Sequence, residues 1–198
     1  MNMTTDFYNT HSAKLINRYD NASMSSLHNL LIKYIPQKSR VLDIGFGSGR
    51  DLQFLQTLDC NIWGIDPSSE FVKNAKNRFP NFKEQFFKAS VPFNKEQFTL
   101  NEKFDIIMSV AMWMHLKNKQ YASVVDSILS VSKITSTIII SYSEGSRVND
   151  ERYFEDVDTD YLIELFKNRG FFLVETIING DSLNRDSLSW KTVVFKHD

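Results

Sequence analysis

The stretch VLDIGFGSGR, residues 41–50, decides the fold of this chain. A short apolar run containing the acid Asp43 opens into three glycines at alternate positions, and an amphipathic segment, residues 51–58, follows directly. This order predicts a strand, a tight glycine turn and the start of a helix. In an open α/β sheet, ligands bind at such a place, beyond the carboxyl end of the strand. The acid argues against a phosphate in the turn and for a ligand with a cationic or hydrogen-bond-donating part.

The composition is typical of one soluble globular domain. The chain has 198 residues, of which 42% are hydrophobic, and its 24 acids nearly balance 23 lysines and arginines. This balance gives no reason to expect nucleic acid or an anionic membrane as a partner. The amino-terminal residues lack an apolar signal core, and no apolar run approaches the roughly 20 residues of a membrane-spanning helix. We therefore expect a cytoplasmic protein.

Strand and helix patterns alternate along the chain, which predicts a doubly wound α/β domain with helices on both faces of a mostly parallel sheet. Seven strands are expected, the last one antiparallel, at residues 40–44, 61–65, 82–88, 104–110, 134–142, 171–178 and 189–196. Helices are expected at residues 6–19, 23–34, 51–58, 70–78, 118–132 and 159–169. Ser68 or Ser69 can cap the helix at 70–78. The first two helices would form a cap or lid within residues 1–36, and residues 37–198 would form the α/β core.

The spacing of the glycines distinguishes between nucleotide ligands. A dinucleotide fingerprint reads G-x-G-x-x-G, whereas the glycines here are Gly45, Gly47 and Gly49, so that the third comes one residue early. The sequence also lacks the phosphate-loop pattern G-x-x-x-x-G-K-[ST]. Asp66 ends the next expected strand, where an acid can accept hydrogen bonds from the hydroxyls of a ribose. The expected ligand is therefore a nucleoside that is not led by a pyrophosphate.

Three motifs in this order resemble class I S-adenosylmethionine-dependent methyltransferases. They are D-x-G-x-G-x-G from Asp43, the acid Asp66 at the end of the second strand, and F-D-x-x-x-S-x-x-x-x-x-H-L over residues 104–116. The resemblance covers about residues 6–142, with a weaker topological fit to the end of the chain. It implies the Rossmann-like methyltransferase fold, S-adenosylmethionine as the cofactor, and methyl transfer as the activity.

The resemblance also implies a cofactor site. The backbone of the glycine turn would pack against the methionine part of the cofactor, with Asp43 beneath it, and Asp66 would accept the ribose hydroxyls. Residues 88–91 fall where the family holds the adenine, with Ser90 in place of the acid that often contacts it. Ser109 falls where the family contacts the cofactor's amino end. The implied cofactor contacts are Tyr8, Arg18, Asp43, Gly45, Phe46, Gly47, Gly49, Arg50, Asp66, Pro67, Ala89, Ser90 and Ser109.

In the family, the loop after the strand at 104–110 borders the acceptor. His115 in this loop could act as a general base, since an imidazole titrates near neutrality. The alternative is that His115 packs at the start of the next helix and bonds to the backbone. Trp113 could wall the methyl-transfer cleft, or it could belong to the core. These two residues are the catalytic candidates.

Two other segments are expected near the acceptor. In methyltransferases of similar layout, an amino-terminal helical pair folds over the cofactor, so Tyr8, Arg18 and Tyr19 are either lid contacts or part of an exposed amphipathic helix. Beyond the strand at 134–142, most of the charges of residues 150–160 are expected to be a solvated surface, and Arg185 and Trp190 are weaker candidates. The polar groups best placed to contact a substrate are Tyr19, Tyr142, Glu144 and Arg147, together with Trp113.

The acceptor class follows from what the sequence lacks. The D/N-P-P-Y/F run of DNA amino-methyltransferases is replaced by residues 109–112, SVAM, and no basic stripe with interleaved aromatics appears. A small molecule therefore fits best, and a protein side chain is possible.

With one cysteine, Cys60, and no ligand spacing among the histidines, no metal site is expected. Two alternatives remain: a nicotinamide-dependent oxidoreductase, and a non-catalytic S-adenosylmethionine-binding or sensing module.

Overall fold

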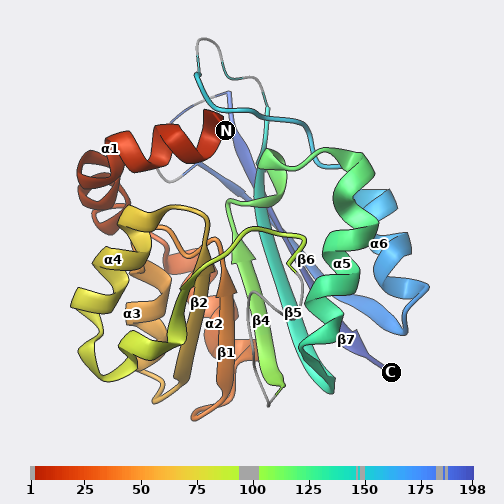
Figure 1. Cartoon of the computed structure of the whole chain (residues 1–198). Helices are drawn as coiled ribbons and strands as arrows, with labels where there is room; N and C mark the ends of the chain where they lie inside the picture. The colour runs from red at the N-terminus through yellow and green to blue at the C-terminus, as the bar shows by residue number, and fades with distance from the viewer. Residues whose placement is uncertain (1–2, 94–102, 146, 148–149, 182–184, 186) are drawn as a thin grey trace.

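Seven strands form one mixed sheet in the order β3-β2-β1-β4-β5-β7-β6 (Figure 1). The computed structural model describes residues 3–93, 103–145, 147, 150–181, 185 and 187–198. Neighbouring strands are parallel, except that β7 runs antiparallel to β5 and β6. The strand order reverses at β1 and β4, where open α/β sheets bind ligands. The strands are β1 Arg40–Ile44, β2 Asn61–Asp66, β3 Phe86–Lys88, β4 Phe104–Val110, β5 Ser132–Glu144, β6 Phe171–Gly180 and β7 Ser189–His197.

Helices cover both faces of this sheet (Figure 1). Leu42 and Ile44 of β1 pack in the core shared with α5 and α6, whereas Val41 packs in the core shared with α2, α3 and α4. This burial on both faces explains why the parallel strands are nearly continuous apolar runs. The helices are α1 Met3–Asp20, α2 Ser25–Tyr34, α3 Arg50–Gln56, α4 Ser69–Arg78, α5 Tyr121–Ser130 and α6 Thr159–Lys167.

The predicted fold class is confirmed, and most elements lie where the sequence places them. The strand expected at 82–88 is shorter, because residues Pro80–Gln85 form a 3-10 turn and only Phe86–Lys88 pairs with β2. Pro80 favours this turn, since its fixed φ suits the start of a helical segment. The helix expected at 118–132 also starts later, after the 3-10 turn Asn118–Gln120, and β5 begins at Ser132.

The two amino-terminal helices have different places. α1 lies across the carboxyl ends of the parallel strands, at the top of the molecule in Figure 1. It is held there by packing of Tyr8 on Phe71 of α4, with ring centroids 5.8 Å apart, and by a bond from Tyr153 N to Thr4 Oγ1 of 3.1 Å. α2 packs on one face of the sheet instead, because its apolar residues share one side of the helix: Leu27, Leu30 and Leu31.

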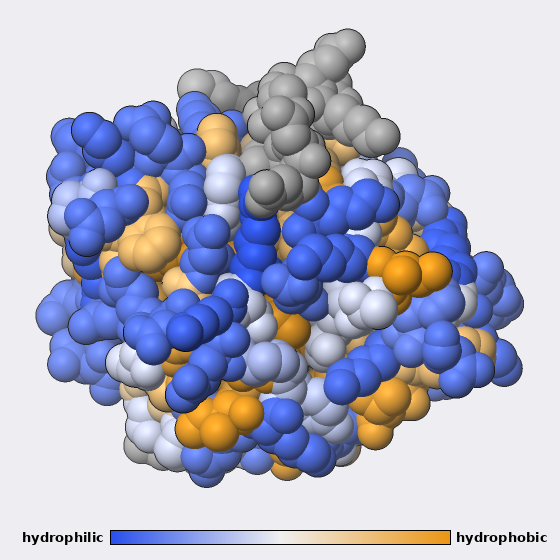
Figure 2. Space-filling view, turned by 90° about the horizontal axis from the view of Figure 1, so that it is seen from below, coloured by the Kyte–Doolittle hydropathy of each residue, from blue (hydrophilic) through white to orange (hydrophobic). Residues whose placement is uncertain are grey.

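The end of the molecule away from α1 has a mainly hydrophilic surface. In Figure 2, which looks onto the end away from α1, hydrophilic side chains dominate and hydrophobic ones are scattered among them. Across the described residues, no helix combines the length and apolar character needed to cross a membrane. The cytoplasmic location stays a prediction.

The cap of α4 provides a test of this arrangement. Ser68 Oγ accepts a bond from Phe71 N at 3.2 Å and donates one to Asn9 Oδ1 at 2.7 Å, so it joins α4 to α1. Ser68→Ala should lower the free energy of unfolding by about 1–2 kcal/mol, because it removes an N-cap and leaves a buried partner unpaired. Urea denaturation measures the change. Ser69→Ala is the matched control, since Ser69 is exposed and should have almost no effect; equal effects of the two variants would contradict this role.

Candidate functional site

A cavity of about 230 Å³ lies between α1 and the carboxyl ends of the parallel strands. Its lining comes from α1, the glycine turn after β1, the end of β2, the segment after β3 and the loop after β4, and from Ser143, Arg147, Arg152 and Phe154 beyond β5. Segments from distant parts of the sequence therefore meet at the switch point of the sheet. The turn predicted to bind the ligand forms one side of the cavity.

The glycine turn needs glycine for two separate reasons. Gly45, Gly47 and Gly49 all have positive φ, of 79°, 56° and 82°, a backbone conformation that other residues adopt only at a cost. A side chain at Gly45 would lie 3.2 Å from Met112 Cβ, whereas one at Gly47 would meet nothing within 4 Å. The backbone of Gly47 therefore faces open space in which a ligand can approach closely.

Asp66 ties the end of β2 to this turn. Its Oδ2 accepts a bond from Gly47 N at 3.0 Å and its Oδ1 accepts one from Ser68 N at 2.8 Å. Burial raises the pKa of Asp66 to about 6, although these two bonds act in the opposite direction. Each carboxylate oxygen can accept about two hydrogen bonds, so both oxygens keep acceptor capacity toward the cavity.

Asp43 lies beneath the turn and is buried, with 2% of its surface exposed. Its Oδ1 has no hydrogen-bond partner among the described residues. Burial, and then the negative charges of Asp51 and Asp66, raise the pKa of Asp43. A buried carboxyl oxygen without a partner is costly, and a donor or cation bound in the cavity would relieve this cost.

Asp51, in the first turn of α3, is a contrasting buried acid. Burial alone would raise the pKa of Asp51, but bonds from His28 Nε2 at 3.0 Å and from Arg50 lower it to about 2. Arg50 also donates to the carbonyl of Tyr19 at 3.4 Å. The cluster therefore fixes the end of α1 beside the glycine turn.

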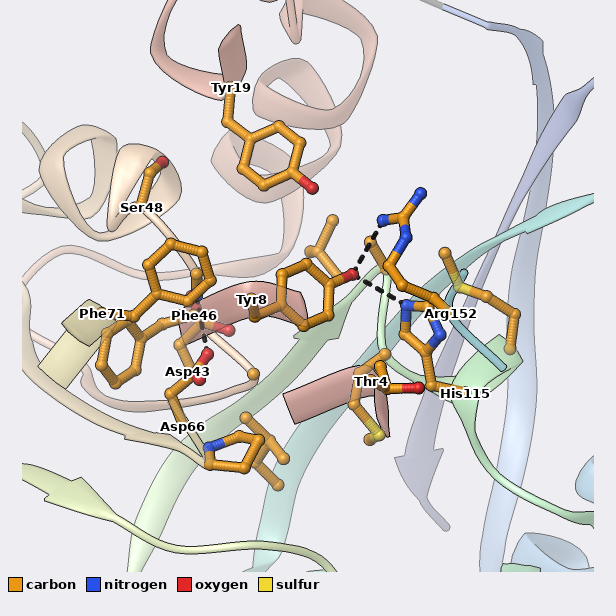
Figure 3. A pocket seen from close by; sticks show the side chains of 18 of the residues that line it. Thr4, Tyr8, Tyr19, Asp43, Phe46, Ser48, Asp66, Phe71, His115 and Arg152 are labelled. Carbon is orange, nitrogen blue, oxygen red and sulfur yellow. Dashed lines mark hydrogen bonds between the residues drawn. The ribbon is translucent and has the colours of Figure 1, made fainter. Parts of the chain in front are cut away.

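A chain of hydrogen bonds crosses the middle of the cavity (Figure 3). His115 Nδ1 lies 2.7 Å from the carbonyl of Tyr153, so this nitrogen carries the proton. His115 Nε2 is then an acceptor for the hydroxyl of Tyr8 at 3.0 Å, and that hydroxyl accepts a bond from Arg152 Nη1 at 3.0 Å. Arg152 is itself held by both oxygens of Asp150. The chain joins α1 to the loop after β4 and to residues 150–153.

Burial keeps both central groups of this chain neutral. It lowers the pKa of His115 to about 4, against the bond to the Tyr153 carbonyl and with the help of the nearby positive charge of Arg152. Burial also raises the pKa of Tyr8. At neutral pH the imidazole and the phenol therefore hold one fixed hydrogen bond.

Tyr8 divides the cavity into two parts (Figure 3). We call the side with Asp43, Gly45–Gly49 and Asp66 the turn half. We call the other side, beyond Tyr8, the arginine half; its members are His115, Arg147, Arg152, Phe154, Arg185 and Trp190. The two halves differ in their ionisable groups, since the acids Asp43 and Asp66 line only the turn half and three arginines line the arginine half.

Most of the sequence-predicted site residues line the cavity. These are Tyr8, Arg18, Tyr19, Asp43, Gly45, Phe46, Gly47, Arg50, Asp66, Pro67, Ala89, Ser90, His115 and Arg147. Their roles stay predictions, but the fold brings them together.

Five predicted site residues lie elsewhere: Gly49, Ser109, Trp113, Tyr142 and Glu144. Trp113 is fully buried edge-on against Tyr121, with ring centroids 5.1 Å apart, so it belongs to the core. Tyr142 is buried and bonds through its hydroxyl to Thr159, and Glu144 pairs with Lys191. Ser109 is buried within β4, and Gly49 precedes α3 below the open part of the turn. None of these five lines the cavity, and for Trp113 the placement agrees with the core alternative; the roles of the other four stay predictions.

The sequence analysis missed Arg152, Phe154, Phe71 and Met112, which all line the cavity. The first two lie within residues 150–160, where Glu151, Asp156, Asp158 and Asp160 are exposed as expected but Arg152 is half-buried against the cavity. The signal available there was the pair of aromatic residues that directly follows two charged ones in ERYF, residues 151–154. Arg185 and Trp190, the weaker candidates, also line the cavity.

Comparisons with known proteins agree with this geometry. Residues 41–134 match the family model described as a methyltransferase domain. The resemblance to methyltransferases found in the sequence is therefore confirmed. A search of the curated proteins by sequence finds no significant match.

Solved structures share the fold over nearly the whole chain. 1,6-didemethyltoxoflavin-N1-methyltransferase from Burkholderia thailandensis, solved with 1,6-didemethyltoxoflavin and S-adenosylhomocysteine, has a TM-score of 0.74 at 14% identity, covering 98% of this chain and 87% of its own. Magnesium protoporphyrin IX methyltransferase from Synechocystis, solved with S-adenosylhomocysteine, has a TM-score of 0.70 at 13% identity, covering 98% of both chains. A TehB-like methyltransferase from Corynebacterium glutamicum has a TM-score of 0.67 at 19% identity, covering 96% and 99%.

The neutral His115 predicts a pH-dependent contribution to stability. Its pKa is about 4 in the folded protein against 6.5 for an ordinary histidine, so between these values the unfolded chain binds a proton that the folded protein does not. The free energy of unfolding should therefore fall by about 2 kcal/mol between pH 7 and pH 5 through this residue. His115→Gln should lose that part of the pH dependence in urea denaturation. An identical pH dependence in variant and wild type would contradict the buried, neutral imidazole.

Proposed function

We propose that this chain is an S-adenosylmethionine-dependent methyltransferase whose acceptor is a small molecule. The observation that carries the proposal is the open space above Gly47, flanked by the unpartnered Oδ1 of Asp43 and by the two Asp66 oxygens, each of which accepts one backbone hydrogen bond and can accept another. This turn lies within the segment 41–134 that matches a methyltransferase domain. Structures of the same fold solved with S-adenosylhomocysteine support the same cofactor.

The residues of the turn half fit each part of this cofactor. The carboxylate of Asp66 suits two ribose hydroxyls, because each of its oxygens keeps a lone pair. The unpaired carboxyl oxygen of Asp43 suits a donor such as the amino group of the methionine part. Pro67, Ala89 and Ser90 line the cavity next to Asp66 and offer a small, partly apolar surface for a flat base. Arg18 and Arg50, near the end of α1, suit the carboxylate of the methionine part.

The main contribution of the protein to methyl transfer is the alignment of the donor and the acceptor. When bound, S-adenosylmethionine supplies a sulfonium methyl group that is already activated for displacement by a nucleophile. α1 covers the cavity, and Tyr8 stands where the two halves meet, so it limits how the reactants approach each other. Holding two reactants in a reactive geometry can contribute on the order of 7–11 kcal/mol to lowering a barrier.

His115 is a positioning residue in this proposal. Its Nδ1 is committed to the Tyr153 carbonyl and its Nε2 to the Tyr8 hydroxyl. With a pKa of about 4 it is also a weak base at neutral pH. The bonds of His115 hold Tyr8 and therefore α1 over the cavity. Any proton released by the acceptor then passes to solvent or to a group of the acceptor itself.

A small-molecule acceptor is supported by the position of α1, whose Thr4, Tyr8, Arg18 and Tyr19 line one side of the cavity. Two of the solved relatives carry small molecules in their names, a toxoflavin precursor and magnesium protoporphyrin IX. A protein side chain is the second choice, because α1 would have to move to admit it. The near-neutral overall charge supports the absence of a nucleic-acid substrate.

Removal of the Asp66 carboxylate tests the cofactor site. Asp66→Ala should weaken S-adenosylhomocysteine binding by at least about tenfold, because hydrogen bonds to a charged group contribute roughly 1.5–3 kcal/mol each. Isothermal titration calorimetry measures the affinity, and thermal unfolding checks that the variant is folded. Asp105→Ala is the control, since Asp105 pairs with Lys133 outside the cavity. Wild-type affinity in Asp66→Ala would sink the proposed placement.

Activity is tested by the release of S-adenosylhomocysteine across a panel of small acceptors. The expected result is turnover with at least one acceptor by a protein that binds the cofactor. Cofactor binding without turnover of any acceptor would favour a non-catalytic binding module. Saturable NADH binding without S-adenosylmethionine binding would instead favour an oxidoreductase and overturn the proposal.

A further inference from the structure

We propose that the acceptor carries an oxyanion, a carboxylate or phosphate group, and that Arg147 binds it. This inference rests on the proposed function, because it names the substrate class of the same cavity. It comes from the arginine half, because Arg147, Arg152 and Arg185 all line the cavity and Arg147 lies close enough to the other two for their charges to lower its pKa.

The three arginines of the arginine half differ in their ion pairs. Arg152 is paired with Asp150 and Arg185 with Asp181, in each case through both carboxylate oxygens. Arg147 forms no ion pair within the described part of the chain. His115 adds no charge, because its pKa is about 4. Of the three arginines, Arg147 is therefore the one without a carboxylate partner in the described part of the chain, while Asp150 and Asp156 lie close enough to raise its pKa against the effect of the other two arginines.

The surroundings of Arg147 favour an anion. Burial, and then the positive charges of Arg185 and Arg152, lower the pKa of Arg147. Arg147 lies in the repulsive field of the two other cations. A bound anion would meet attraction from all three groups, and a neutral ligand would leave the repulsion in place.

The geometry of Arg147 leaves its donors available. The guanidinium lies over the ring of Phe154, 4.0 Å from its centroid, and contacts the hydroxyl of Ser143 and, at 3.5 Å, the carbonyl of Gly145. A guanidinium has five N–H donors, so three are left for a ligand. Its planar fork matches the two oxygens of a carboxylate or phosphate.

The same surroundings indicate a flat apolar body next to the anion. Phe154 and Trp190 both line the arginine half, and Trp190 is fixed by a bond from its Nε1 to Asp181 Oδ1 of 2.7 Å. Asp181 also holds Arg185, so the same carboxylate joins Trp190 to one of the arginines. An aromatic acid is therefore the simplest compound that satisfies both the aromatic residues and the arginines.

Arg147 is separated from the residues that suit the methionine carboxylate. Arg50 lies in the turn half and bonds to Tyr19, next to Arg18 on α1. Arg147 instead lies on Phe154, which packs on His115 with ring centroids 4.6 Å apart, beyond Tyr8. The two sets of arginines thus face opposite ends of the cavity, and only one of them is near the glycine turn.

The test uses benzoate and benzamide, which share shape and differ in charge. The protein is first saturated with S-adenosylhomocysteine, and each probe is then titrated and followed by NMR at low salt. Benzoate should bind at least about tenfold more tightly than benzamide to the wild type. Arg147→Gln should bring the two affinities to within about twofold. Arg169→Gln is the matched control, since Arg169 pairs with Asp126 away from the cavity, and it should keep the wild-type preference.

Other outcomes have separate meanings. Equal affinities for the two probes in the wild type, absence of benzoate binding, or an unchanged preference in Arg147→Gln would overturn this inference while cofactor binding stands. A large loss of S-adenosylhomocysteine affinity in Arg147→Gln would also overturn it, because Arg147 would then serve the cofactor. Failure of the wild type to bind S-adenosylhomocysteine would count against the proposed function itself. Retained benzamide binding in Arg147→Gln shows that its cavity is folded.

Discussion

The arrangement of the site depends on the two backbone hydrogen bonds that the Asp66 carboxylate accepts. One comes from Gly47 in the turn after β1 and the other from Ser68 at the cap of α4. A single buried side chain thus joins two neighbouring strand ends and one helix start. Because Ser68 also bonds to Asn9, the same connection extends to α1 above the cavity. The cover, the turn and the sheet edge therefore keep a fixed relation to one another.

The local parts of this site could be predicted from the sequence, and the reason is physical. The glycine turn and its two acids lie directly at the ends of β1 and β2, and the strand pattern of the sequence predicts where these strands end. The positive φ of Gly45 and Gly47 and the bond from Gly47 N to Asp66 are therefore local features. The strands β1 and β4 are buried on both faces, so their apolar runs are unambiguous. The sequence pattern overestimates the length of β3, because the apolar residues of a 3-10 turn can look like those of a strand.

The rest of the site could not be predicted, because tertiary packing decides it. Arg152 meets Tyr8 across 144 positions of sequence, and no local pattern encodes that contact. Tyr142 and Trp113 lie near strand ends like true ligand contacts, but their side chains enter the core beneath α5 and α6. The hydrophobic periodicity and the spacing of the motifs show that a residue is near the edge of the sheet. They do not show which face its side chain takes.

The ionisable groups that lack an ion-pair partner on the two sides of Tyr8 have opposite chemical character. Two charges attract or repel each other more strongly where little water surrounds them. A buried ion without a partner lowers the stability of the folded protein, because it has lost its hydration. Arg152 and Arg185 meet this constraint with their own carboxylates, and Asp51 meets it with His28 and Arg50. Asp43 and Arg147 are the groups on each side of Tyr8 with capacity left over. A cationic donor at one end and an oxyanion at the other would complete both, and the two proposed reactants would then approach each other beside Tyr8.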